Sequence, residues 1–314
     1  MFTKILVPLD GSPLGERALP IAASIAQSVN ASLLLVRAVW TRNMTPGLDS
    51  GETYLSAVQE AEAYLEAVAR RLGAGVQVEV VAPPAPAPLG ILQVAEQDKA
   101  DLIVMTTHGR SGLSRWVYGS VAEAVLSRSR VPVLLVRTNA LATASHRPAA
   151  GAERPRLLVP LDGSAFAETA IAPAAELARA FDWTVTLLRV VTTTTPVVVD
   201  AELQRPFLPE NLLQQARSDA ELYLASVASS LRREGLRVQP CLRVGEAAEA
   251  ILDECYASGA SLVVMATHGR TGLGRLLYGS VAAEVLHRGT LPLLLVRPEG
   301  LKIPAGSEPA LAAD

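Results

Sequence analysis

Cysteine, lysine and aromatic residues are scarce in this chain of 314 residues. Cys241 and Cys255 match no common zinc spacing, so the sequence predicts two reduced thiols packed in a core. No run of about 18 uncharged apolar residues occurs, so no membrane span is expected. A strand-like run begins at Lys4 and leaves no room for a signal peptide before it, which predicts a cytoplasmic location.

An excess of charge of one sign is also missing. The 28 Lys and Arg residues are nearly balanced by 31 Asp and Glu residues, which gives a net charge of -3. A nucleic-acid-binding surface requires clustered basic residues, so nucleic acid is not an expected partner. The chain is 50% apolar, which excludes a disordered protein, and its length suggests two domains.

The motifs of the common phosphate-binding loops are absent. Gly-Lys-Ser and Gly-Lys-Thr occur nowhere, and the lysines, Lys4, Lys99 and Lys302, lie outside every glycine-rich segment. The dinucleotide-binding fingerprint Gly-x-Gly-x-x-Gly does not follow the first strand-like run. Any nucleotide site in this chain therefore requires another arrangement of glycines.

What the sequence contains instead is a repeat. The segment Ile5–Ser12 (ILVPLDGS) returns as Leu157–Ser164 with seven of eight residues identical. The segment Met105–Val121 returns as Met265–Val281 with 12 of 17 residues identical. The chain is therefore predicted to hold two copies of one domain. The predicted parts are domain 1 (1–138), a linker (139–154), domain 2 (155–298) and a flexible tail (299–314).

Each copy alternates short apolar runs with helix-like segments. The runs are nearly continuous in Val, Ile and Leu, which is typical of parallel strands covered on both faces. The alternation predicts two tandem, doubly wound α/β domains, each a parallel sheet with helices on both faces. In the first copy, helices are expected near 14–29, 53–72, 89–99 and 121–128. Strands are expected at 4–9, 32–39, 76–81, 102–106 and 133–137, and again at 156–161, 185–191, 237–242, 262–267 and 293–297.

Two features of each copy are expected at the carboxyl ends of the strands, where ligands bind in open α/β sheets. The first is the aspartate that ends the first strand, Asp10 or Asp162. The second is a glycine-rich loop, 109–120 or 269–280, which runs directly into a helix. A helix N-terminus offers free N–H groups, so this arrangement suits a phosphate.

A simpler interpretation of the loop needs no ligand. Ser120 and Glu123 have the spacing of a capping box, in which the serine side chain caps the following helix. In the second copy Ala283 takes the place of Glu123, while Gly279 and Ser280 remain. The lost box weakens this interpretation without excluding it.

These motifs, in the same order and present twice, resemble the universal stress protein family. The resemblance covers about residues 1–138 and 155–298 and rests on the ILVPLDGS block, the Thr-His-Gly-Arg-x-Gly-Leu loop, the later Gly-Ser-Val and the closing VPVLLVR strand. It implies a five-stranded parallel sheet of order 3-2-1-4-5 in each domain. For the ATP-binding branch it also implies a loop Gly-x2-Gly-x9-Gly-Ser/Thr, whose first glycine is replaced here by Thr106 or Ala266.

The resemblance also implies a ligand, ATP with Mg²⁺ or Mn²⁺, and a set of residues that bind it. The aspartates would meet the adenosine, Ala38 and Val190 would line the adenine pocket, and the loop residues would hold phosphates. Thr106 and the proline-rich run 83–88 depart from the family pattern, so the second copy is expected to bind better. The implied residues are Pro8, Asp10, Ala38, Met105, Gly109, Gly119, Ser120 and Val121 in the first copy, and Pro160, Asp162, Val190, Met265, Ala266, Gly269, Gly279, Ser280 and Val281 in the second.

The implied function is a nucleotide-binding protein of the stress response, and not an enzyme. One alternative is a slow ATPase or phosphotransferase, but fast phosphoryl transfer needs a cationic clamp and no lysine lies in either loop. The other is a partner-binding stress protein without nucleotide. The two domains are expected to pair as an internal pseudo-dimer through the edge strands 133–137 and 293–297, and the family adds a possible homodimer of chains.

Overall fold

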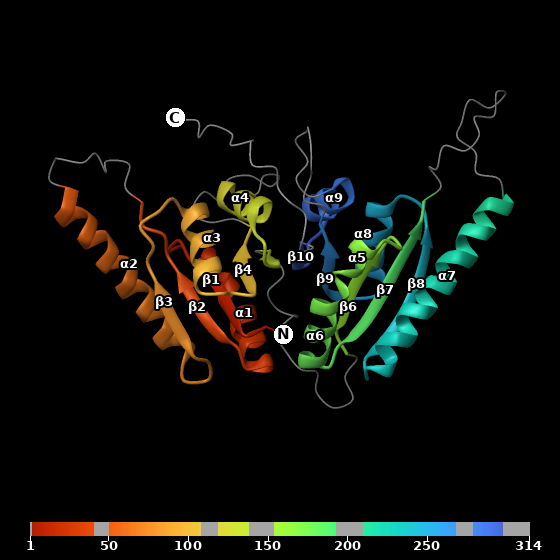
Figure 1. The fold of residues 1–314 in the computed structure, drawn as a ribbon, viewed down its shortest axis with the longest axis horizontal. Helices are drawn as coiled ribbons and strands as arrows, with labels where there is room; N and C mark the ends of the chain where they lie inside the picture. The colour runs from red at the N-terminus through yellow and green to blue at the C-terminus, as the bar shows by residue number, and fades with distance from the viewer. Residues whose placement is uncertain are drawn as a thin grey trace, which may run out of the picture.

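The computed structural model describes residues 2–40, 50–107, 119–137, 154–192, 210–267 and 279–297. Figure 1 shows two similar halves, the first copy on the left and the second on the right. The predicted tail lies outside the described residues, and so does the predicted linker apart from Arg154. Only the last two residues of each glycine-rich loop are described, 119–120 and 279–280, so the rest of the loops plays no part in the geometry given below.

The strands of both copies occur in the predicted order and agree with the predicted ranges to within a few residues. Their β-branched and leucine content suits a pleated surface that is buried on both sides. The strands are β1 (Lys4–Pro8), β2 (Ser32–Val36), β3 (Val78–Val81), β4 (Leu102–Thr106), β5 (Val133–Val136), β6 (Arg156–Leu161), β7 (Thr184–Val191), β8 (Arg237–Val244), β9 (Ala260–Ala266) and β10 (Leu293–Val296).

The helices also follow the prediction, with one correction at the start of the chain. The expected helix over 14–29 begins as a 3-10 turn, η1 (Gly15–Ala18), and becomes α-helical only at Leu19. The Ser12 hydroxyl accepts the Gly15 N–H at 3.0 Å and so stabilises this tighter turn. The α-helices are α1 (Leu19–Val29), α2 (Ser50–Leu72), α3 (Ala87–Gln97), α4 (Ser120–Arg128), α5 (Ala165–Glu168), α6 (Ile171–Phe181), α7 (Glu210–Arg233), α8 (Ala247–Ala257) and α9 (Ser280–Arg288).

The strands form one ten-stranded sheet of order β3-β2-β1-β4-β5-β10-β9-β6-β7-β8. Within each copy all pairs are parallel and the order is 3-2-1-4-5, as the family resemblance implied. The two copies meet where β5 and β10 pair antiparallel, with Leu134 opposite Leu294. The edge strands predicted as pairing surfaces therefore do pair, and they join the two sheets into one.

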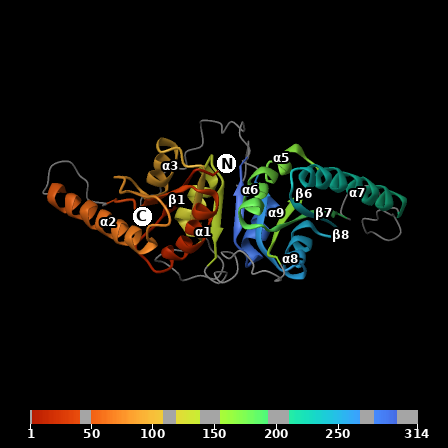
Figure 2. The same cartoon turned by 90° about the horizontal axis from the view of Figure 1, so that it is seen from below.

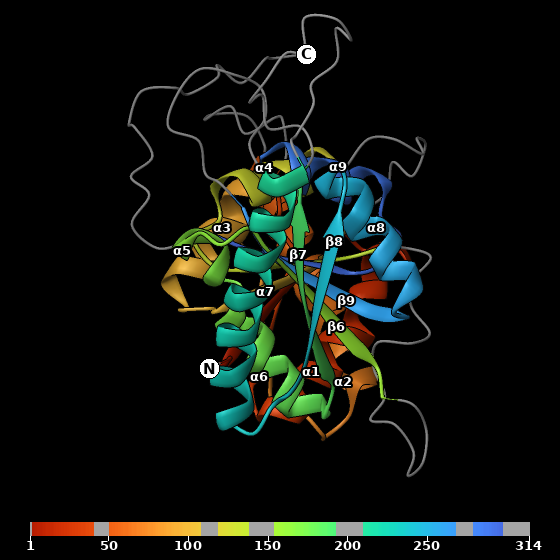
Figure 3. The same ribbon diagram turned by 90° about the vertical axis from the view of Figure 1, so that its right-hand side faces the viewer.

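Helices cover both faces of the sheet, and each face has its own core. Alternate residues of β1 enter the two cores: Ile5 and Val7 pack with residues of α1 and α2, and Leu6 packs with residues of α3 and α4. Figure 3 shows the same division in the second copy, with α6 and α7 on one side of the strands and α8 on the other. Seen from below in Figure 2, α1 and α6 lie near the centre and α2 and α7 extend outward.

Two arginines reinforce the joint between the copies reciprocally. Arg137 follows β5 and donates to the carbonyl oxygens of Leu286 and Gly289, at the end of α9 in the other copy. Arg297 follows β10 and donates to the carbonyl oxygens of Ser127, at 2.9 Å, and Ser129, at 3.3 Å, at the end of α4. The last carbonyls of a helix have no partner within it, so each copy satisfies backbone groups of the other.

None of the helices within the described ranges is both long and apolar enough to cross a membrane.

Candidate functional site

The turn after the first strand of each copy fixes an aspartate at the carboxyl edge of the sheet. Gly163 has φ +82°, a conformation that glycine adopts without strain, and it lets the chain fold back after Asp162. The Asp162 carboxylate accepts hydrogen bonds from the Ser164 backbone N–H at 2.9 Å and from the Ser164 hydroxyl at 2.5 Å. The equivalent bonds of Asp10 in the first copy are 2.9 and 2.6 Å, so the Asp-Gly-Ser motif builds the same turn twice.

The Asp162 carboxyl is held in its ionised form. Partial burial acts to raise its pKa, but the hydrogen bonds from Ser164 and the positive charge of Arg189 outweigh this effect and lower the pKa below its ordinary value. Asp162 therefore presents a charged acceptor at the end of β6.

The second feature is the start of the helix after the glycine-rich loop. Ser120 and Ser280 are the first helical residues, and the N-cap positions belong to Gly119 and Gly279. Neither N-cap makes a side-chain hydrogen bond, because glycine has no side chain. The capping-box interpretation of Ser120 is therefore wrong, since that serine stands one residue too late to cap α4. The first amides of both helices are left without a side-chain cap and can bind an anion.

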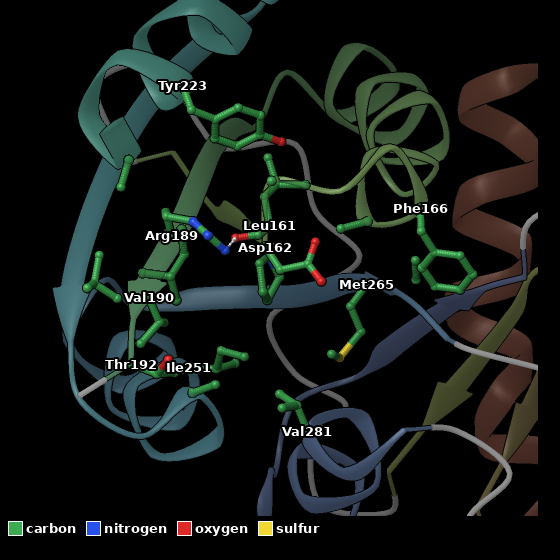
Figure 4. Close-up of a pocket in the computed structure, with 18 of the residues that line it drawn as sticks. Leu161, Asp162, Phe166, Arg189, Val190, Thr192, Tyr223, Ile251, Met265 and Val281 are labelled. Atoms are coloured by element: carbon green, nitrogen blue, oxygen red, sulfur yellow. Dashed lines mark hydrogen bonds between the residues drawn. The ribbon is translucent and has the colours of Figure 1, made fainter. Parts of the chain in front are cut away.

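Between these two features of the second copy lies a cavity of about 980 Å³ (Figure 4). It opens at the carboxyl ends of β6, β7 and β9, with α7, α8 and the start of α9 around it. Of the predicted nucleotide-binding residues, Gly269 lies outside the described ranges. All the others line this cavity: Pro160, Asp162, Val190, Met265, Ala266, Gly279, Ser280 and Val281.

The first copy has a smaller cavity, of about 400 Å³, at the corresponding place. Thr106, the β-branched replacement of the family glycine, is among its lining residues. Gly109 lies outside the described ranges, and the remaining predicted residues line the cavity: Pro8, Asp10, Ala38, Met105, Gly119, Ser120 and Val121.

The proline-rich run of the first copy packs against a glycine of α3. The Pro83 ring packs so close to Gly90 that a Cβ atom on this glycine would lie 3.0 Å from Pro83 Cγ and 3.4 Å from the Ala38 Cβ. Ala38 itself lines the cavity. In the second copy the same turn contains Gly245, with φ +144° and open space around it.

Sequence reasoning missed several charged and aromatic residues in the second cavity. Arg189, at the end of β7, and Asp219 and Tyr223, on α7, all line it. The Tyr223 hydroxyl donates to Glu168 at 2.9 Å, and burial together with this bond raises the pKa of Tyr223, so the phenol stays protonated. The repeat contained the signal for the arginine, because Arg37 occupies the position of Arg189 in the first copy.

The two arginines have different surroundings. Arg37 forms an ion pair of 3.3 Å with Glu60 and lies over the Tyr64 ring, 5.0 Å from its centroid. Arg189 donates instead to the Leu161 carbonyl oxygen at the long distance of 3.4 Å. Asp219 stands where the first copy has Glu60, as the equivalent bonds Tyr64–Glu16 and Tyr223–Glu168 show, but its side chain is one methylene shorter.

Comparison with known proteins shows the family of this chain. The model of the universal stress protein family matches residues 1–137 and 153–297. The chain belongs to this family. A universal stress protein of Methanocaldococcus jannaschii is 34% identical over 147 residues, which cover 44% of this chain and 83% of that protein. A universal stress protein of Mycobacterium bovis is 29% identical over 204 residues, which cover 64% of this chain and 63%, or less than two thirds, of that protein.

Solved universal stress proteins share the fold over nearly the whole chain. The crystal structure of one from Archaeoglobus fulgidus has a TM-score of 0.68 at 20% identity and covers 94% of this chain and 98% of its own. A second, from Pseudomonas aeruginosa, has a TM-score of 0.62 at 18% identity, covering 95% and 94%. The two-domain arrangement of this universal stress protein is therefore seen in relatives.

Proposed function

We propose that this universal stress protein binds ATP in the cavity of its second copy and acts in the stress response by binding, and not by catalysis. The observation that carries the proposal is the arrangement of the cavity. The cavity is lined by the start of α9, whose first amides have no side-chain cap, by the Asp162 carboxylate, and by the apolar side chains Val190 and Ile251. A nucleotide has the matching parts, an anionic phosphate chain and a flat apolar base with polar edges.

Backbone groups would hold the phosphates. The amides at Ser280 and Val281 start α9 with the positive end of its dipole, and the Ser280 hydroxyl is not used for capping. The near-neutral charge of the chain is compatible with such a site, because backbone amides need no basic surface.

A divalent cation would come with the nucleotide. No cluster of three His, Cys, Asp or Glu side chains occurs in the described part of the chain. Magnesium prefers phosphate oxygens and water to an all-protein cage. The Ser280 hydroxyl is the described side chain that we propose as its ligand, with Mn²⁺ as an alternative ion. Among the described residues at the start of α9 that line the cavity, none is a lysine or an arginine, so we expect ATP hydrolysis to be slow or absent.

Isothermal titration of the intact chain with ATP and Mg²⁺ tests the proposal. We expect one strong site per chain, and mass spectrometry of the purified protein should detect adenine nucleotide released on denaturation. Failure to bind ATP at millimolar concentration would overturn the proposal. Prolonged incubation with ATP separates binding from turnover, because a binding protein leaves the nucleotide intact.

The first copy favours a second role. Its cavity is smaller, Thr106 lines it, and its arginine already forms an ion pair with Glu60. We propose that this copy contributes mainly structure or partner binding, in a cytoplasmic protein whose two domains form the internal pair. Light scattering tests whether two chains associate further: a mass of one chain would exclude a homodimer.

A further inference from the structure

In the second cavity, Arg189 is the one cationic side chain among the described lining residues. Figure 4 shows its guanidinium reaching over the end of β6 toward the Leu161 carbonyl, beside Asp162. Among the described residues this carbonyl is its one hydrogen-bond acceptor, at 3.4 Å, and no carboxylate lies within ion-pair distance. A guanidinium has five N–H donors, so within the described part of the chain most of them have no hydrogen-bonded acceptor and can serve a ligand in the cavity that Arg189 lines.

The surroundings of Arg189 decide which ligand group would meet it. Asp162 lies beside Arg189, Asp219 lines the same cavity, and the lowered pKa of Asp162 keeps this carboxyl charged. A phosphate placed there would be repelled by the carboxylates, whereas at the start of α9 it meets amides. The end near Arg189 is therefore suited to an uncharged group that offers an acceptor and a donor side by side.

A purine base has such an edge. On adenine the exocyclic amino group is a donor, and the neighbouring ring nitrogens, N1 on one side and N7 on the other, are acceptors. The carboxylate can accept from the amino group while the guanidinium donates to a ring nitrogen. Apolar contact with the flat faces of the base would come from side chains such as Val190, Ile251 and Met265, which line the same cavity.

We infer that Arg189 is a base-recognition residue of the second site, which donates a hydrogen bond to a purine ring nitrogen beside the amino group that Asp162 accepts. This inference rests on the proposed function. The first copy differs at this point. There Glu60 forms an ion pair with Arg37, whereas in the second copy the shorter Asp219 leaves Arg189 available to a ligand.

The test uses the intact chain, ATP, 1-deaza-ATP and 7-deaza-ATP, with the affinity measured by calorimetry. Each analogue lacks one ring nitrogen acceptor. The native chain should bind one analogue roughly tenfold to 100-fold more weakly than ATP, because that analogue loses a hydrogen bond from a charged donor. Arg189→Met should weaken ATP binding by a similar factor and remove the discrimination between ATP and that analogue.

Arg37→Met is the matched control, because this arginine is already paired with Glu60, and it should leave the strong site unchanged. Thermal unfolding followed by circular dichroism checks that both variants fold. Equal affinity of the native chain and Arg189→Met for all three nucleotides would overturn the inference and leave ATP binding intact. Equal weakening for all three would also overturn it, since the arginine would then contact ribose or phosphate. Absence of ATP binding by the native chain would overturn the proposed function itself.

Discussion

The two copies share one backbone plan and differ at the carboxyl edge of the sheet. In the first copy a proline-rich run packs against Gly90, Arg37 is paired with Glu60, and the cavity measures about 400 Å³. In the second, the same turn contains Gly245, Arg189 forms no close ion pair with a described carboxylate, and the cavity measures about 980 Å³. A few substitutions around a shared backbone are thus enough to give the two copies different cavities at the same edge of the sheet.

The largest effect is expected from Gly279→Glu. Gly279 has φ +78°, so any side chain there is strained, and a carboxylate would occupy the anion end of the cavity. We expect ATP affinity to fall by about 100-fold or more, because the added carboxylate would occupy the place of a phosphate and repel the remaining ones. Titration calorimetry measures the loss.

Gly119→Glu in the first copy is the matched control for this variant. Gly119 has φ -58°, and a Cβ atom there would meet only the Thr107 carbonyl oxygen at an ordinary 3.5 Å. The strong site should survive this change. A loss of ATP binding as large as that of Gly279→Glu would show that the first copy carries the ligand, which reverses the comparison.

The joint between the copies should be the next most sensitive feature. Leu134 and Leu294 are opposite each other across β5 and β10 and are almost completely buried. We expect Leu294→Ala to lower the free energy of unfolding by about 2–5 kcal/mol. Because the two side chains are neighbours, the double change with Leu134→Ala should cost less or more than the sum of the single changes. Denaturant unfolding of the four proteins measures this coupling, and strict additivity would contradict it.

Exchange of the acidic residues near the arginines should have a smaller effect. Asp219→Glu lengthens the side chain to that of Glu60, which lets it pair with Arg189 as in the first copy. We expect ATP affinity at the second site to fall by roughly threefold to tenfold, about the value of one exposed charge pair. The reverse change, Glu60→Asp, should leave ATP affinity at the second site unaffected. An equal loss of affinity from both changes would show that pairing with Arg189 is not the cause.

The smallest effect concerns acid titration. Asp162 has a pKa below its ordinary value of 3.8. The stabilisation from its ionised form is therefore complete above pH 3.8 and is lost as the pH falls through the lower, folded-state value. Ser164→Ala removes the hydroxyl donor and should shift the carboxyl titration upward, which carbon-detected NMR can follow. An unchanged midpoint would contradict the role given to Ser164.

Most of the fold could be predicted from the sequence, because buried parallel strands and the repeat leave strong local signals. The aspartate at the end of each first strand and the Gly-Ser start of each last helix were also found from the sequence alone. The capping-box interpretation of Ser120 was wrong, because residue spacing alone does not show whether a helix starts at a serine or one residue after it. Arg189 and Asp219 were missed because they come together only when one side of β7 packs near one side of α7. The packing of the whole domain decides which sides these are, and sequence spacing does not show it.

The antiparallel pair of β5 and β10 also has a consequence for the behaviour of the protein on dilution. Two separate chains held together by such edges would come apart at low concentration, by mass action. Here both edges belong to one polypeptide, and Arg137 and Arg297 bind across the joint. The proportion of the two halves is therefore fixed at one to one however low the protein concentration is, so the joint does not depend on that concentration.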